Sequence, residues 1–308
     1  MGSSTDPHWL DPQRMRRAFE RAAATYDRAA VLQREVGQRL AERLALVRLQ
    51  PAAILDVGCG TGDALGELST RYPEALVLGL DSAYGMLEIA RRRTAAARAA
   101  ERSLFARWFA AKTRSGTEPS LVGGDACALP LAAASVDLVW SNLALQWVND
   151  ASVAFGEFGR VLKSGGLLLF STLGPDTLKE LRRAFASIDQ ATHVSRFLDM
   201  HDLGDMLVHT GFADPVMDME TITLTYDDAL TMMRELKAIG AHNATRGRPR
   251  GLIGRARWQR VLAALEAFRR DGRLPATYEV VYGHAWKPEP RLAADGRAIV
   301  RFAPRPGA

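Results

Sequence analysis

The chain carries one stretch that is more informative than any other, Ile54-Leu-Asp-Val-Gly-Cys-Gly-Thr-Gly62. Its apolar beginning predicts a buried strand, and its three alternating glycines predict a turn whose backbone a ligand can approach closely. The helix expected after this turn would direct its free N–H groups toward the same ligand. The loop lacks the Gly-Lys-Ser/Thr of phosphate loops, and Asp63 interrupts the spacing of dinucleotide-binding loops. Because Asp56 would repel a pyrophosphate, the loop favours a nucleoside with a positive centre.

Four later segments follow the loop in the order expected for the strands of a parallel sheet. They are Val77-Leu-Gly-Leu-Asp81, Leu121-Val-Gly-Gly-Asp125, Val136-Asp-Leu-Val-Trp-Ser141, and Leu162-Lys-Ser-Gly-Gly166 with Leu167-Leu-Leu-Phe-Ser171. Together with the loop, these segments resemble the class I S-adenosylmethionine-dependent methyltransferases. The resemblance implies an α/β fold: a doubly wound, Rossmann-like sheet with an N-terminal helical flap and a C-terminal α/β segment that covers the substrate.

The same resemblance implies a cofactor, S-adenosylmethionine, and the residues that hold it. Asp81 ends the second expected strand, where a carboxylate can accept two hydrogen bonds from a ribose diol. Asp125 matches the position that binds the adenine amino group, and Asn142 stands at the carboxyl edge of the sheet, where ligands bind in doubly wound folds. The residues expected to contact the cofactor are Gln33, Asp56, Gly58, Cys59, Gly60, Gly62, Asp81, Ser82, Met86, Asp125, Ala126 and Asn142.

We expect the chain to divide into four regions. These are a helical flap at 1–50, the cofactor-binding core at 51–172 with an inserted helix at about 94–120, a substrate- and carrier-binding cap at 173–288, and a tail at 289–308. The inserted stretch is rich in Ala and Arg, and it is interpreted either as an extra helix packed on the core or as an arm that docks a partner.

Periodicity places several elements within these regions. Apolar residues at helical spacing predict two flap helices between about Asp11 and Arg48 and a core helix from about Ala64 to Arg71. After two helices in the cap, the pattern predicts strands over Thr221–Tyr226 and around Tyr278–Trp286.

Composition narrows the class of protein. Hydrophobic residues make up 47% of the chain, as in ordinary globular proteins, and no apolar run of about 18 residues predicts a transmembrane helix. The start Met1-Gly-Ser-Ser-Thr-Asp-Pro7 has no signal-peptide core, so we expect a cytoplasmic protein. Cys59 and Cys127 are too few for a disulfide framework and are interpreted as packing residues in a reducing compartment. Neither C-x-x-C nor H-E-x-x-H occurs, so no metal is expected.

The segments outside the core resemble a narrower family, the malonyl-acyl-carrier-protein O-methyltransferases of biotin synthesis (BioC family), over roughly residues 15 to 285. The matching stretches are Phe19-Glu-Arg-Ala-Ala-Ala-Thr-Tyr-Asp27 with Leu32-Gln33, Trp140-Ser-Asn-Leu-Ala-Leu-Gln-Trp147, Thr172-Leu-Gly-Pro-Asp-Thr-Leu-Lys-Glu-Leu181, Arg196-Phe-Leu198, Leu236-Lys-Ala-Ile-Gly-Ala-His-Asn-Ala244 and Pro275-Ala-Thr-Tyr278. The stretch at 94–120 and the tail after about 288 depart from the family pattern. The resemblance implies methyl transfer to the free carboxylate of a malonyl thioester.

This chemistry predicts which residue types the site needs. A carboxylate is already ionised at neutral pH, so catalysis rests on desolvating and aiming it rather than on a general base. Arg196 is the first candidate to position the carboxylate, because arginine can grip it with two parallel hydrogen bonds; a salt bridge at a helix start is the alternative. Tyr26 is expected to close over the cofactor from the flap, or else to pack. Gln146 and His242 are expected to line the substrate channel.

The net charge of +5 and the pI near 9.5 suggest an acidic partner. The basic residues do not interleave with aromatic ones as on a single-strand nucleic-acid surface, so nucleic acid is not expected. We expect Lys237, Arg246, Arg248 and Arg250 to receive an acidic carrier protein or its phosphopantetheine phosphate. A loop of solvated charges is the alternative.

Two other functions stay open at this point. A quinone or polyketide methyltransferase would need a general base, for which His201 and His242 are the candidates. Parts of the C-terminal half are also similar to mitochondrial complex I assembly factors of the same superfamily that hydroxylate a protein arginine, although no two-His-one-carboxylate iron set is evident. Whether coenzyme A rather than a carrier protein bears the acyl group is also open.

Overall fold

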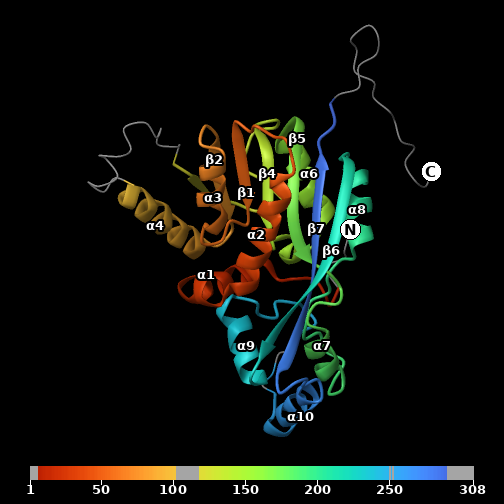
Figure 1. Ribbon diagram of the computed structural model, residues 1–308. Coiled ribbons are helices and arrows are strands. Elements are labelled where there is room, and N and C mark those ends of the chain that lie inside the picture. The colour runs from red at the N-terminus through yellow and green to blue at the C-terminus, as the bar shows by residue number, and fades with distance from the viewer. Residues whose placement is uncertain (1–5, 102–117, 250, 252, 290–308) are drawn as a thin grey trace, which may run out of the picture.

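The computed structural model describes residues 6–101, 118–249, 251 and 253–289, and its centre is a seven-stranded mixed sheet of order β3-β2-β1-β4-β5-β7-β6 (Figure 1). The strands are β1 (Ala53–Val57), β2 (Leu76–Asp81), β3 (Ser120–Gly123), β4 (Val136–Asn142), β5 (Leu162–Leu173), β6 (Ala213–Tyr226) and β7 (Leu274–Trp286). The first five run parallel, and β7 is antiparallel to both of its neighbours. This arrangement is the doubly wound α/β sheet that the sequence predicted.

Helices cover both faces of the sheet. Among the described residues the α-helices are α1 (Pro12–Ala29), α2 (Val31–Ala45), α3 (Asp63–Arg71), α4 (Tyr84–Glu101), α6 (Ala151–Val161), α7 (Lys179–Ala186), α8 (Met200–His209), α9 (Ala229–Ala238) and α10 (Arg255–Glu266), of which α1, α7, α9 and α10 lie beyond the carboxyl ends of the parallel strands (Figure 1). The two flap helices and the core helix expected at about 64–71 are confirmed. Residues 102–117 of the expected insertion, and all of the tail but residue 289, lie outside the described residues.

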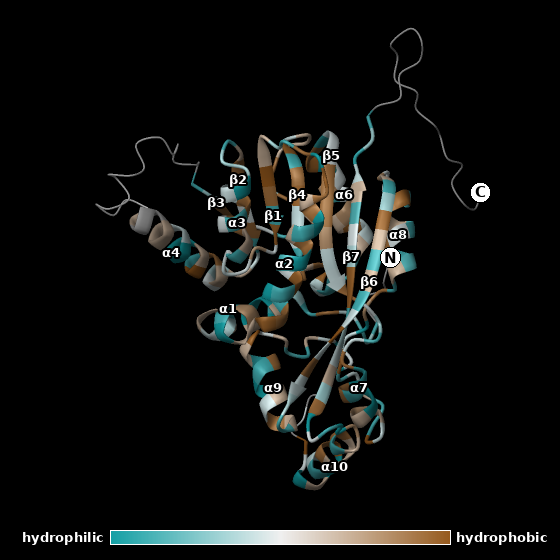
Figure 2. Cartoon of the chain, in the orientation of Figure 1, coloured by the Kyte–Doolittle hydropathy of each residue, from teal (hydrophilic) through white to brown (hydrophobic). Residues whose placement is uncertain are grey.

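Successive side chains of the central strands point alternately into two apolar cores, one on each face of the sheet. Leu138 in β4 and Leu167 in β5 pack with α2 and α3 on one face, whereas Val139 and Phe170 pack with α6 and α8 on the other. Figure 2 shows the hydrophobic colouring along β1, β4 and β5 and the hydrophilic colouring mainly on the surrounding helices. Burial on both faces explains why these strands read as continuous apolar runs in the sequence.

Helix α1 of the flap lies across the carboxyl ends of the parallel strands, and α2 lies against one face of the sheet (Figure 1). Asp11 begins α1 as its N-cap and accepts hydrogen bonds from the backbone of Gln13 and Arg14. Alanines on the inner side of α1 allow close packing against α4 and α9. Just before α1, Leu10 forms an isolated antiparallel bridge with Thr245, which joins the N-terminal segment to the cap.

The cap is continuous with the sheet, because both share the strands β6 and β7. The strands β6 and β7 form a long antiparallel pair, although α9 and α10 separate them in the chain. Residues 280–286 of β7 pair with β5, and the rest of the pair continues past the sheet, where α7, α9 and α10 surround it (Figure 1). Both strands are longer than predicted: β6 begins at Ala213 instead of Thr221, and β7 at Leu274 instead of Tyr278. The early part of β6 alternates exposed and half-buried residues, so its side chains carry little apolar signal.

Candidate active site

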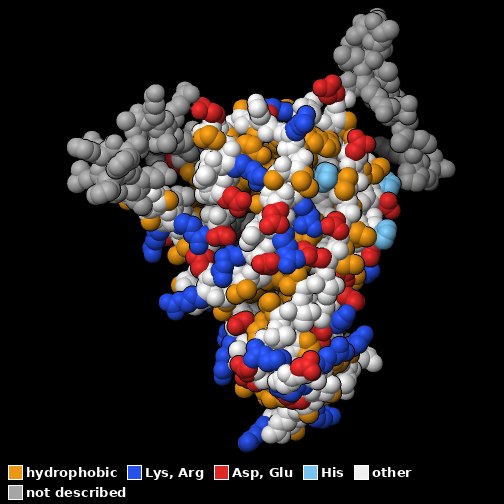
Figure 3. Space-filling model, viewed as in Figure 1, with side chains coloured by type: hydrophobic (Ala, Val, Ile, Leu, Met, Phe, Trp, Pro, Cys, Tyr) orange, Lys and Arg blue, Asp and Glu red, His pale blue; other side chains and the backbone are white. Residues whose placement is uncertain are grey.

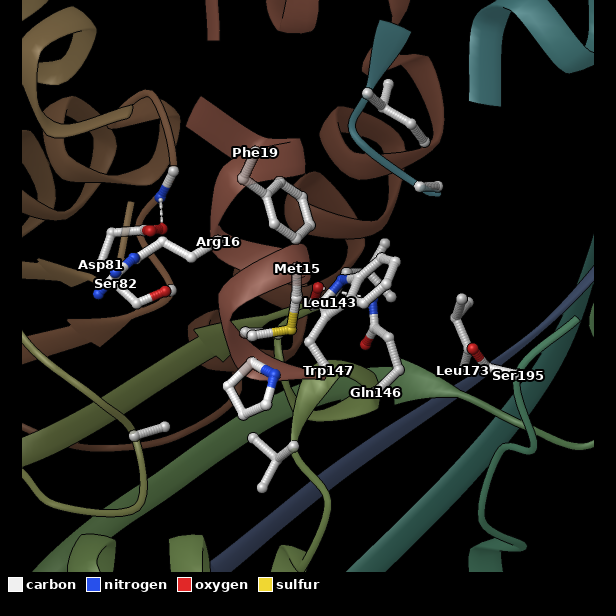
Figure 4. Close-up of a pocket in the computed structure, with 18 of the residues that line it drawn as sticks. Met15, Arg16, Phe19, Asp81, Ser82, Leu143, Gln146, Trp147, Leu173 and Ser195 are labelled. Atoms are coloured by element: carbon white, nitrogen blue, oxygen red, sulfur yellow. Dashed lines mark hydrogen bonds between the residues drawn. The ribbon is translucent and has the colours of Figure 1, made fainter. Parts of the chain in front are cut away.

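A cavity of ≈ 780 Å³ lies where the flap, the sheet and the cap meet. Such a volume suits a nucleoside cofactor together with part of a second ligand. In Figure 4, Met15, Arg16 and Phe19 project from α1 toward Asp81 on one side of this cavity and toward Trp147 on the other. The cavity therefore lies at the carboxyl edge of the sheet, where the fold class places its ligands.

The glycine loop forms the floor of the cavity. Gly58 and Gly60 line it with left-handed φ angles of 76° and 53°, which side chains other than glycine rarely adopt. A Cβ on Gly58 would lie 2.4 Å from the Cβ of Ala144, so a larger residue has no room there. The N–H groups of Gly58 and Cys59 donate to the carbonyl of Leu80 and fix the turn.

Asp81 stands at the end of β2 with its carboxylate aimed across the loop. Its Oδ2 accepts from the Gly60 N–H at 3.0 Å, and its Oδ1 accepts from the Ala83 N–H at 2.8 Å. Burial raises the pKa of this carboxyl, while the backbone donors oppose the rise. Each oxygen keeps a second lone pair, so the group retains acceptor capacity for a ligand diol.

Asp56, just before the glycine turn, is buried and does not line the cavity. Burial, followed by the charges of Asp81 and Asp63, raises the pKa of Asp56 to about 8. The loop is thus backed by carboxyls that a nearby cation would favour in the ionised form.

The flap contributes two side chains to the wall. Tyr26 reaches the cavity near Asp81, and burial, followed by the charges of Asp81 and Asp27, raises its pKa, so the phenol stays neutral. Gln33 lines the cavity too, and its buried Oε1 has no hydrogen-bond partner. The Gln33 carbonyl accepts from Asn142 Nδ2 at 2.9 Å, and Asn142 Oδ1 accepts from Ser171 at 2.7 Å. Asn142 therefore fastens the flap to β5.

The other end of the cavity is largely apolar. Phe19 and Trp147 meet edge to face, with 5.1 Å between the ring centroids. Gln146 faces the cavity, but its amide is held at both ends, by donation to the Leu143 carbonyl at 2.6 Å and by acceptance from Thr172 at 3.3 Å. Most of the remaining wall at this end comes from Leu173, Leu178, Leu181, Val194, Phe197, Leu236 and Ile239.

His242 joins this end from the segment after α9. Burial lowers the pKa of the imidazole, and the nearby charges of Lys237 and Arg21 lower it further. The ring is therefore neutral at pH 7 and cannot act as a cation toward a carboxylate.

The structure brings most of the predicted site residues into one cavity. Those that line it are Tyr26, Gln33, Gly58, Gly60, Asp81, Ser82, Met86, Asp125, Ala126, Asn142, Gln146 and His242. Asp56, Cys59 and Gly62 belong to the glycine-loop segment but do not line the cavity. Gly62 begins α3 with φ 79°, and burial raises the pKa of the Cys59 thiol.

Arg196 is not part of this cavity. It lies in a neighbouring one of ≈ 590 Å³, which shares His193, Val194, Ser195 and Phe197 with the first. The coil that carries Arg196 is thus a wall between two cavities, and the guanidinium belongs to the far side.

Several wall residues escaped the sequence analysis. Both Arg16 and Phe19 lie on α1. Phe19 is two turns before Tyr26 and Arg16 is about one turn before Phe19, so helical spacing would have indicated them in succession. His193 and Ser195 come from a coil without periodicity and gave no such signal. His193 shares a 2.8 Å hydrogen bond with Asp189 and stacks on Phe185, so its ring is held in place.

The described part of the chain contains neither a metal-binding cluster nor a membrane-spanning helix. Across residues 6–101, 118–249, 251 and 253–289, no group of three or more His, Cys, Asp or Glu side chains is placed to hold a metal ion. Within the same residues, every helix is too short or too polar to cross a membrane.

Of the basic residues expected to meet a partner, Lys237 and Arg246 are exposed, and Arg248 is half-buried. Arg248 donates to the Thr245 carbonyl at 2.7 Å, so part of its hydrogen-bonding capacity is used within the cap. Arg250 lies outside the described residues.

Comparison with known proteins agrees with this geometry. A family profile described as a methyltransferase domain matches residues 55–170. The YcgJ protein of Bacillus subtilis has the same fold, with a TM-score of 0.54 at 17% identity, covering 81% of this chain and 98% of its own. A putative methyltransferase of Bacillus halodurans gives 0.52 at 18% identity, covering 81% and 99%.

Full-length relatives are much more similar in sequence. A malonyl-[acyl-carrier protein] O-methyltransferase of Laribacter hongkongensis is 57% identical over 97% of this chain and 98% of its own length. One of Methylovorus sp. is also 57% identical, over 98% of both chains. One of Legionella pneumophila is 38% identical over 91% of this chain and 92% of its own. The chain therefore belongs to the family of these S-adenosylmethionine-dependent O-methyltransferases.

Proposed function

We propose that this chain transfers a methyl group from S-adenosylmethionine to the free carboxylate of a malonyl thioester on acyl carrier protein, an early step of biotin synthesis. The observation that carries the proposal is the 57% identity, over nearly the whole chain, to proteins named for this reaction. It includes the cap, where enzymes of one fold differ in substrate. The quinone-type and arginine-hydroxylating alternatives have no comparable support.

The cavity fits the cofactor at the glycine-loop end. Asp81 is suited to the ribose diol, and Asp125 with Ala126 to the adenine. The orphaned Oε1 of Gln33 is a buried acceptor that a cofactor ammonium group would satisfy. The carboxylates of Asp81 and Asp125 give this end a negative character that suits a sulfonium. When bound, S-adenosylmethionine supplies an electrophilic methyl group on its sulfur.

The apolar end suits the acceptor. In-line displacement requires the carboxylate to approach the methyl group from the side opposite the sulfur, so the two ligands must occupy opposite ends of the cavity. Trp147, Leu173 and Ile239 exclude water there, which strips the carboxylate of hydration and raises its reactivity. The neutral phenol of Tyr26 lies at the glycine-loop end, near Asp81, and can donate a hydrogen bond. The chain then has to hold and orient two ligands, and it needs no general base.

Arg196 is proposed to bind the malonyl carboxylate. Arg196 retains the role only if its coil turns the guanidinium toward the first cavity when the acceptor binds, because it lines the neighbouring cavity here. Gln146 and His242 are proposed to contact the acyl chain rather than the carboxylate. His242 is neutral, and Gln146 is held at both ends.

The carrier protein is proposed to dock beside α9. Figure 3 shows Lys and Arg side chains, mixed with acidic ones, over the part of the molecule where α1, α9 and α10 lie. Lys237 is exposed and near enough to His242 to lower its pKa, so a positive charge stands beside the acceptor end of the cavity. Arg246 and Arg248 extend this basic region. We place the reaction in the cytoplasm, in keeping with the free thiols of Cys59 and Cys127.

The test uses methyl-labelled S-adenosylmethionine with malonyl-carrier protein, acetyl-carrier protein and malonyl-coenzyme A. The proposal predicts label only on malonyl acceptors and its release as methanol in mild alkali, because a methyl ester is base-labile. Base-stable label, or label on the acetyl acceptor, would contradict it. Lys237→Ala should raise KM for the carrier-bound acceptor and leave KM for the coenzyme A thioester unchanged; an equal effect on both would remove the docking role.

A further inference from the structure

A single carboxylate, that of Asp27, ties the flap to the glycine loop. Its Oδ1 accepts from the Thr61 hydroxyl at 2.6 Å, and its Oδ2 accepts from Arg93 Nη2 at 2.6 Å. Arg93 Nη1 donates to Asp63 at 2.9 Å. The group thus joins the last turn of α1, the loop and the first turn of α3 through a cation on α4.

The surroundings distinguish this contact from an ordinary surface ion pair. Thr61 is buried, and it sits between the two loop glycines Gly60 and Gly62. Because Thr61 belongs to the cofactor-binding turn, its hydrogen bond to Asp27 couples the flap to that turn. Arg34 Nη1 donates to the Asp27 carbonyl at 2.5 Å, which also fixes the junction of α1 and α2.

The residue next to Asp27 is Tyr26, whose side chain lines the cavity. Adjacent residues of a helix point in directions about 100° apart, so anchoring Asp27 to the loop sets where the Tyr26 phenol points. Asp27 itself does not line the cavity. Its influence on a ligand has to pass through Tyr26 and through the loop.

We infer that Asp27 is a positioning residue, which closes the flap onto the glycine loop and so holds Tyr26 over the bound cofactor. With the tie formed, the flap and the loop move as one body. With the tie lost, α1 keeps its packing on α4 and α9, but Tyr26 is no longer fixed against the loop. The inference rests on the proposed function only in naming the ligand as S-adenosylmethionine.

The test compares cofactor binding in Asp27→Asn and Arg93→Met with the unaltered protein, by calorimetry and by stopped-flow release of S-adenosylhomocysteine. The amide keeps the shape of the aspartate but removes its charge. Since charged hydrogen bonds are strong and this one is partly exposed, we expect affinity to fall about tenfold and release to quicken by a similar factor. Asp27→Glu, which keeps the charge, should recover part of the loss.

Two matched controls should bind the cofactor like the unaltered protein. Glu35→Gln makes the same acid-to-amide change on the flap, where Glu35 pairs, among the described residues, only with Arg39 of its own helix. Arg92→Met changes the neighbour of Arg93, whose partner is Glu88 on the surface of α4. Melting temperatures within about two degrees of each other would show that all variants fold. Unchanged cofactor affinity in Asp27→Asn would overturn the inference.

A double-mutant cycle separates positioning from mere stabilisation. If Asp27 acts through Tyr26, then Tyr26→Ala should weaken cofactor binding much less in the Asp27→Asn background than in the unaltered protein. Additive effects would contradict the inference. These measurements need no acceptor. They can fail while malonyl-carrier protein is methylated, and they can succeed with any other acceptor.

Discussion

Asp81 is the residue on which cofactor recognition most depends. Removing its carboxylate in Asp81→Ala should weaken S-adenosylmethionine binding by about 1.5–3 kcal/mol, the cost of a lost charged hydrogen-bond set. Because the carboxylate also accepts from Gly60 and Ala83, the loop loses two anchors at the same time. Calorimetry measures the loss, and Asp81→Asn, which keeps the acceptor facing one donor, should lose less. Affinity equal to that of the unaltered protein would remove Asp81 from the ribose role.

Asp56 predicts how cofactor binding depends on pH. Its pKa is raised to about 8, so it is mostly protonated at pH 7 before the cofactor binds. A bound cation favours the ionised form and therefore expels a proton. The affinity for the cofactor should therefore fall as the pH drops from 8 to 6, by at most about tenfold per pH unit. Calorimetry in two buffers of different ionisation enthalpy would detect the released proton. Asp56→Asn should abolish the pH dependence, and a pH-independent affinity in the unaltered protein would contradict the assignment.

At the scale of elements, the contact of α1 with α9 holds the flap against the cap. Gly240 has φ 79°, and a Cβ there would lie 2.9 Å from the Phe19 ring. Gly272 has a similar φ of 74° but no atom within 4 Å of such a Cβ. Gly240→Ala should therefore cost about 2–4 kcal/mol of unfolding free energy and Gly272→Ala only about 1, because both pay for backbone strain but only the first clashes. Denaturant melts of the two variants measure the difference. Equal losses of unfolding free energy in the two variants would show that the α1–α9 contact accommodates the added methyl group without destabilising the protein.

Elements also show where sequence reasoning succeeds. The parallel half of the sheet was predictable because β1, β2, β4 and β5 are buried on both faces and must be apolar. The start of β6 was not, because polar and apolar residues share its exposed side.

The position of Arg196 was equally hidden. Its coil is held by distant contacts, such as Asn243 Nδ2 donating to the Thr192 carbonyl at 2.5 Å, and no local pattern records them. The cofactor residues were easier to predict, because alternating glycines and carboxylates that directly follow apolar runs are recognisable patterns in the sequence. The substrate wall comes from several separate segments, and only tertiary packing brings them together.

At the scale of the whole molecule, one cavity joins two chemically different ends. The glycine-loop end is backed by carboxyls and suits a cation, whereas the far end is apolar and suits a desolvated carboxylate. The flap covers both ends, and the antiparallel β6–β7 pair carries the cap that closes the second. This division explains how a fold that many enzymes share can be directed to a small acyl acid on a large carrier.

The most direct test of the central claim is the intact mass of malonyl-acyl-carrier protein after incubation with the purified protein and S-adenosylmethionine. We expect the malonyl carrier to gain the mass of one methyl ester and acetyl-carrier protein to gain none. The Asp81→Ala variant should methylate the malonyl carrier more slowly. An unmodified malonyl carrier, in the presence of protein that demonstrably binds the cofactor, would contradict it.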